Sequence, residues 1–140
     1  MAGAPPHPIP ERQGGAYVFV EPASGWTNST ETAKLTANDP ANGDELGTSV
    51  SISGTVVLVG APEANVGNNL DQGAVYAFVK PAGGWVTTSS YAVKLVSSDG
   101  AQGDEFGFSV CVSGTTGVVG AIGATVNGNI EQGAAYLFGQ

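Results

Sequence analysis

Apolar and polar residues alternate with a period of two along several short stretches of the chain. Val50 and Ile52 alternate with serines, and Tyr76 and Phe78 share one face of another stretch. A third stretch, residues 55–61, is a nearly continuous apolar run, which is typical of a strand buried on both faces. The pattern predicts a set of four strands at residues 47–53, 55–61, 74–79 and 85–95.

This four-strand pattern recurs along the chain with a period of about 60 residues. Gly43-Asp44-Glu45 returns at 103–105, and residues 44–80 share 19 of 37 positions with residues 104–140. A further outer strand is predicted at 26–35. Strands of a sandwich need not repeat in this way, whereas a propeller repeats four-stranded blades around an axis. We therefore predict an all-β fold of propeller blades, each of four antiparallel strands, in about two and a third repeats.

The repeat divides the chain into one segment with three parts. Residues 1–42 form a partial blade that begins with a stub of its second strand at 2–4, residues 43–102 form a full blade, and residues 103–140 form a blade lacking its outer strand. A propeller closes with about four to eight blades. The missing blades come either from other copies of the chain, which complete each other's blades in a ring or a filament, or from a longer protein of which this chain is a fragment.

Charge and hydropathy exclude several classes of protein. Four basic residues against twelve acidic ones give a net charge of −8, so a basic surface for nucleic acid is absent. The negative charge favours solubility, with cation binding as the alternative. No apolar run is long enough to span a membrane. Residues 1–10 lack the basic and apolar regions of a signal peptide.

The sequence predicts no enzyme. Its one histidine, His7, and one cysteine, Cys111, exclude an internal disulfide and a Cys/His zinc site. Cys111 lies in an alternating apolar run and is predicted to be a buried or half-buried strand residue without a basic partner. Neither a Ser-His-Asp set nor a phosphate-binding loop emerges. A pair of carboxylates for glycoside hydrolysis is an open alternative. The identical Asp-Glu pairs of the repeats favour a structural role instead.

Two acidic loops precede the repeats. A calcium site there is the weaker interpretation, and no other cofactor is predicted. Turn formation is the stronger interpretation, because Asp and Asn cap tight turns and Gly supplies positive φ. The candidate calcium ligands are Asp39, Asp44, Asp99 and Asp104.

Two loops rich in Asn and Gly, 63–71 and 123–131, differ more between the repeats. Variable loops on a rigid scaffold are where ligands bind, so glycans or surface proteins are possible partners, with plain connectors as the alternative. The candidate ligand-binding residues are Asn65, Asn68, Asn69, Asp71, Asn127, Asn129 and Glu131. Trp26 and Trp85 could stack on sugars, but their matched positions favour packing between blades. The recurring tyrosines Tyr17, Tyr76 and Tyr136 are predicted to be structural.

Several of these recurring residues spell a known pattern. Glu105-Phe106-Gly107, Gly114 and Val119-Gly120-Ala121 resemble the FG-GAP repeat, which builds the propeller of integrin α subunits and of many bacterial surface proteins. The resemblance implies blades, an adhesion-type role and a location outside the cell or at its surface. It departs at Leu46, which replaces the Phe. The calcium hairpin of the integrin version is not carried over, because residues 53–55 are too few and contain no acid.

Overall fold

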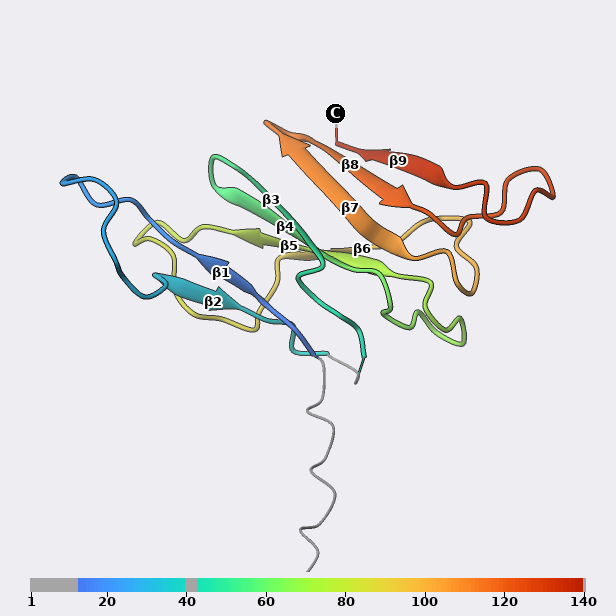
Figure 1. The fold of residues 1–140 in the computed structure, drawn as a ribbon, viewed down its shortest axis with the longest axis horizontal. Coiled ribbons are helices and arrows are strands. Elements are labelled where there is room, and N and C mark those ends of the chain that lie inside the picture. The colour runs from blue at the N-terminus through green and yellow to red at the C-terminus, as the bar shows by residue number, and fades with distance from the viewer. Residues whose placement is uncertain (1–12, 40–42, 140) are drawn as a thin grey trace, which may run out of the picture.

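The computed structural model describes residues 13–39 and 43–139. These residues form nine strands and contain no helix that could cross a membrane. The strands make three antiparallel sheets, which follow one another from blue to red in Figure 1. The first sheet holds β1 (Ala16–Val18) and β2 (Ala33–Leu35); the middle sheet holds β3 (Ser49–Ser53), β4 (Val56–Ala61), β5 (Ala74–Val79) and β6 (Val93–Leu95); the last sheet holds β7 (Phe106–Ser113), β8 (Thr116–Ala121) and β9 (Ala134–Phe138).

The inner strands of the middle sheet confirm the predicted pattern. β4 is buried along nearly its whole length, as its continuous apolar sequence predicts. β5 has the predicted bounds and places Tyr76 and Phe78 in the core against the first sheet. The last sheet repeats this arrangement with β7, β8 and β9, which pair in the same order.

The outer strands are shorter than predicted. Of the stretches 26–35 and 85–95, only β2 and β6 pair as strands. For the stretch 85–95 the reason lies at Thr88, whose N–H donates to the Lys34 carbonyl at 3.0 Å and whose carbonyl accepts the Thr36 N–H at 3.0 Å. This segment leaves its own sheet and ties the middle sheet to the outer strand of the first.

Cys111 lies in strand β7 as predicted, but its predicted burial is wrong, because this side chain is exposed. Its neighbours Val110 and Val112 pack toward the middle sheet, and strand alternation turns Cys111 to the opposite face of β7. No described sheet covers that face. The strand stub predicted at 2–4 lies outside the described residues.

Two apolar clusters hold the three sheets together. The cluster between the first and middle sheets includes Val18, Leu35, Val59, Tyr76 and Phe78. The cluster between the middle and last sheets includes Leu58, Val75, Phe106, Val119 and Tyr136. Burial of apolar surface between sheets is therefore the main stabilising contribution, since each sheet is too small to enclose a core alone.

Serines of β3 fasten the middle sheet to the last. Ser49 Oγ donates to the Gly107 carbonyl at 2.7 Å, and Ser51 Oγ accepts the Val112 N–H at 3.0 Å. The sheets approach so closely here that a β-carbon at Gly60 would collide with the Gly107 carbonyl oxygen. Gly107 itself has a φ of 98°, which a residue with a side chain rarely adopts.

Candidate interaction surfaces

The chain makes the same sheet-to-sheet contact twice. In the first contact, Tyr76 and Phe78 of β5 are buried against the first sheet. In the second, their counterparts Tyr136 and Phe138 of β9 pack against the cluster that includes Leu58 and Ala77 of the middle sheet. Both contacts therefore combine one face that carries aromatic side chains with one that carries aliphatic side chains.

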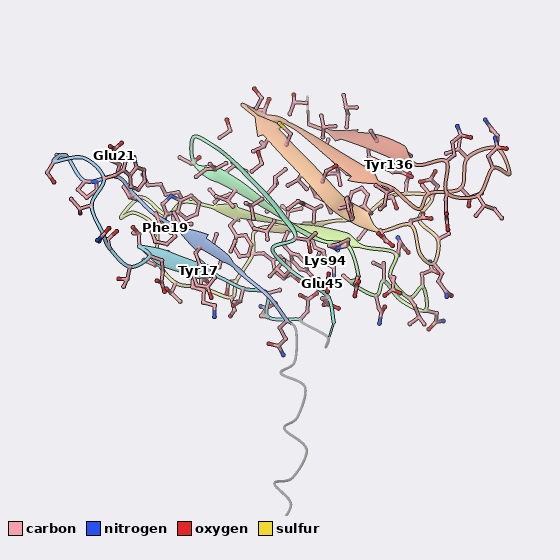
Figure 2. The ribbon with its side chains drawn as sticks, in the orientation of Figure 1. Tyr17, Phe19, Glu21, Glu45, Lys94 and Tyr136 are labelled. Carbon is pink, nitrogen blue, oxygen red and sulfur yellow. The ribbon has the colours of Figure 1, made fainter. Side chains whose placement is uncertain are left out.

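The same aromatic face recurs on the first sheet and the same aliphatic face recurs on the last sheet, and both are exposed. Phe19, which directly follows β1, is 49% exposed, whereas its counterpart Phe78 is 2% exposed. Leu137 of β9 is 74% exposed, whereas its counterpart Ala77 is 9% exposed. Figure 2 labels Tyr17 in β1, Phe19 just after this strand and Tyr136 on the distant β9. Among the described residues, nothing covers the aromatic face of the first sheet or the aliphatic face of the last sheet.

The tryptophans follow the same division. Trp85 packs against the cluster between the first and middle sheets, as predicted for packing between blades. Trp26 is exposed, so that prediction is wrong for the first repeat. Trp26 lies in the segment that connects β1 to β2, and no described sheet precedes the first sheet.

The two Asn/Gly loops share one backbone geometry despite their different sequences. Val66 and Asn69 exchange two backbone hydrogen bonds of 3.1 Å, and Val126 and Asn129 exchange bonds of 3.1 and 2.9 Å. Asn69 Nδ2 donates to Gln72 Oε1, as Asn129 Nδ2 does to Gln132 Oε1. Each loop is therefore an ordered turn that is held by its own hydrogen bonds.

Of the candidate ligand residues, Asn65, Asn69 and Asn129 have side chains with internal hydrogen-bond partners. Asn65 Oδ1 accepts the Asp71 N–H at 3.0 Å, and Asp71 adopts a left-handed φ of 53°. Asn127 and Glu131 are left-handed as well, with φ of 52° and 54°. Asn68 is exposed at the tip of its loop. The structure brings these residues together within each loop, and a ligand for them stays a prediction.

The first Asn/Gly loop also binds the acidic loop that leads into the last sheet. The carbonyls of Leu70, Asp71 and Gln72 accept backbone N–H groups of Gly103, Glu105 and Phe106, at 3.0, 3.1 and 2.9 Å. Asn69 Nδ2 reaches the Gly100 carbonyl at 3.3 Å. This loop is a connector between successive sheets.

The candidate calcium ligands lie in the acidic loops but are partnered by protein groups. Asp39 Oδ2 pairs with Lys94 Nζ at 2.8 Å, and Lys94 lies over the Tyr76 ring, 5.2 Å from its centroid. Asp104 Oδ2 accepts the Ala101 N–H at 2.8 Å, which closes a turn as predicted. Asp44 is buried. Within 13–39 and 43–139, no three Asp, Glu, His or Cys side chains gather into a metal-binding group.

Electrostatics distinguish the two acidic loops. Partial burial opposes ionisation of Asp39, but the hydrogen bond and charge of Lys94 outweigh it and lower the pKa of that carboxyl. Tyr136 OH donates to Asp99 Oδ1 at 2.9 Å. Desolvation and this carboxylate raise the pKa of Tyr136 to about 12.

Sequence reasoning missed Lys94 and the serines of β3 as contacts between sheets. Lys94 had a signal, since Lys34 precedes the matching leucine of the first repeat and lies over Tyr17 in the same way. The sequence signal for the serines is weaker, because only Ser49 and Ser53 recur in the next repeat, as Ser109 and Ser113.

Comparison with known families agrees with this arrangement. The FG-GAP repeat matches residues 29–78 and 90–138. Each match runs from the outer strand of one sheet through the three inner strands of the next, that is from β2 to β5 and from β6 to β9. No curated protein matches the chain. The three sheets are thus successive blades of a β-propeller-type module, and the chain belongs to the FG-GAP repeat family.

Proposed function

We propose that this chain is a non-enzymatic structural module that assembles head to tail with further copies of itself. The observation that carries the proposal is the pair of free faces at its two ends. The aromatic face of β1 and the aliphatic face of β9 are the two halves of a contact that the chain already buries between its own blades.

The side chains on the two faces are complementary. Tyr17 and Phe19 correspond to Tyr76 and Phe78, which pack against the preceding blade. Val118 and Leu137 correspond to Leu58 and Ala77, which receive the following blade. A contact between two copies would therefore reproduce the internal one.

The backbone adds to this complementarity. Ile130, Glu131 and Gln132 correspond to the residues whose carbonyls accept bonds from the next acidic loop. Ile130 is among the most exposed of the large apolar side chains. In the described residues, β9 also lacks an outer strand. A neighbouring copy could complete this blade by strand pairing along β9.

Such a contact joins two different surfaces, so it runs from copy to copy. It gives a ring where the rotation closes and a filament where it does not. A non-catalytic role is proposed with it, because the loop side chains Asn65, Asn69 and Asp104 serve the fold through internal hydrogen bonds.

Light scattering after size-exclusion chromatography tests the proposal, with the chain at about 100 µM, a concentration that reveals contacts of micromolar affinity. We expect oligomers for the native chain, and monomers for Tyr17→Glu and for Leu137→Glu. Val86→Glu, at an exposed site outside both faces, is the control and should assemble. Negative-stain microscopy then separates rings from filaments. A native chain that stays monomeric would overturn the proposal.

Mixing the two variants tests the direction of the contact. Each variant keeps one intact face, so an equimolar mixture should form a dimer of one chain of each kind and grow no further. A mixture that stays monomeric contradicts the head-to-tail contact.

A further inference from the structure

An apolar groove lies beside β1, on the side away from β2. It has a volume of about 390 Å³. The middle sheet lines it with Val50, Ile52 and Val57, and the segment around β1 lines it with Ala16, Tyr17, Val18 and Phe19. Val50 and Ile52 are more than half exposed there, although they lie on a central blade. Exposed aliphatic side chains around a hollow are a feature of interaction sites.

The backbone of β1 offers unpaired groups to this groove. The Val18 carbonyl accepts the Thr32 N–H at 2.7 Å on the β2 side. Backbone groups alternate in direction along an antiparallel strand, so those of Tyr17 and Phe19 point to the groove. Among the described residues, β1 pairs with β2 alone. The groove thus combines a strand edge with an apolar wall.

The next blade shows what fills such a groove. There β4 pairs with β5, the counterpart of β1, and lies against β7. Its register sets Leu58 opposite Ala77, the counterpart of Val18. Leu58 is buried in a cluster that includes Val110 and Val112, the counterparts of Val50 and Ile52.

From this correspondence we propose that the groove is a β-strand acceptor site. Its ligand is an extended, β-branched segment with the pattern of β4, which pairs antiparallel with β1 and places an aliphatic side chain opposite Val18. Main-chain hydrogen bonds supply affinity in this mode of recognition, and the side-chain pocket supplies selectivity.

The inference goes beyond the proposed self-assembly, because the bound segment is not part of a folded copy. In a folded copy, β4 and β8 are each paired on both edges within their own sheet. The ligand is instead an extended segment of another polypeptide, free of such pairing.

A labelled peptide that copies residues 55–62, with lysines added at both ends for solubility, tests the site by fluorescence anisotropy. We expect saturable binding to the full chain, weakened about tenfold or more by Val50→Glu, which removes an exposed wall residue without opening the core. Val86→Glu is the matched control and should bind as the native chain does. Absence of saturation up to about 1 mM would overturn the proposal.

A second peptide separates strand pairing from simple apolar adhesion. Val57 and Val59 of β4 stand opposite Phe78 and Tyr76, so N-methylation of their copies removes the N–H groups that would pair with β1. We expect this peptide to lose binding, and equal binding of both peptides contradicts a strand acceptor.

The titration is repeated with Leu137→Glu, whose altered side chain lies on the opposite end face. Peptide binding by a chain that does not assemble supports the groove and counts only against self-assembly. An assembling chain that binds no peptide supports self-assembly and overturns the groove.

Discussion

The middle blade and the two outer blades use nearly the same sequence in different surroundings. Phe78 in the middle blade and Phe19 in the first blade occupy matching positions, yet only Phe78 is buried. Ala77 and Leu137 differ in the same way at the other end. A repeat position is therefore a core position only where a neighbouring blade covers it.

The boundaries of the sequence repeat do not coincide with the boundaries of the blades. Each family match joins an outer strand to the inner strands of the following blade. The polypeptide thus crosses from blade to blade within every repeat, and Thr88 adds backbone bonds across the same junction. Stability in this arrangement comes largely from contacts between neighbours, as in other repeat proteins.

Truncation of matched phenylalanines should show the largest effect. We expect Phe78→Ala to lower the free energy of unfolding by about 3–5 kcal/mol, because it removes a buried aromatic side chain. Phe19→Ala should cost less than about 1 kcal/mol, since its ring is already half exposed. Urea unfolding followed by tryptophan fluorescence, at low protein concentration, measures both. Equal costs would mean that Phe19 is covered in solution.

The closest approach of two blades should give the next largest effect. Gly60→Ala forces a methyl group against the Gly107 carbonyl, and overpacking of this kind costs about 1–3 kcal/mol. Gly83→Ala, in an open turn with no atom near its β-carbon position, is the control and should be nearly neutral. Thermal unfolding compares the two variants, and a neutral Gly60→Ala would refute the tight contact.

The two matched loop asparagines sharpen the comparison further. Asn69→Ala removes bonds to Gln72 and to the next blade at Gly100, so we expect a loss of about 1 kcal/mol. Asn129→Ala removes one exposed bond, to Gln132, and should cost a few tenths of that. Hydrogen exchange of the Gly103 and Phe106 amides should rise only in the first variant. Identical exchange in both variants would argue against a connector role.

The smallest expected effect depends on pH. Tyr136 has a pKa raised to about 12 by desolvation and Asp99, above the ordinary value of about 10. Its hydrogen bond therefore contributes stability below pH 10, and this contribution is lost as the pH rises toward 12. Relative to the native chain, Tyr136→Phe should be slightly less stable near neutral pH and should close that gap across this window. Urea unfolding at a series of pH values measures the difference, and a constant gap would contradict the assignment.

Much of the fold followed from local pattern, whereas the contacts between blades did not. Strand periodicity located β3, β4 and β5, and the repeat located their counterparts in the last blade. The outer strands were overestimated because Thr- and Val-rich residues favour strands in general. The actual course of residues 85–95 depends on bonds that Thr88 makes to another blade. The pairing of Asp39 with Lys94 likewise joins residues far apart in the sequence.

The sequence by itself determined the strand class, the period of the repeat and the family, because these depend on spacing and on residue type along one stretch of chain. Only the tertiary structure decided which copy of each repeated residue is buried. It also decided that the serines of β3 bind the next blade, that Cys111 is exposed and that a groove lies beside β1. Burial is a property of neighbours in space, so similar segments acquire different roles: within the described residues the middle blade has a blade on each side, and each outer blade has one on a single side.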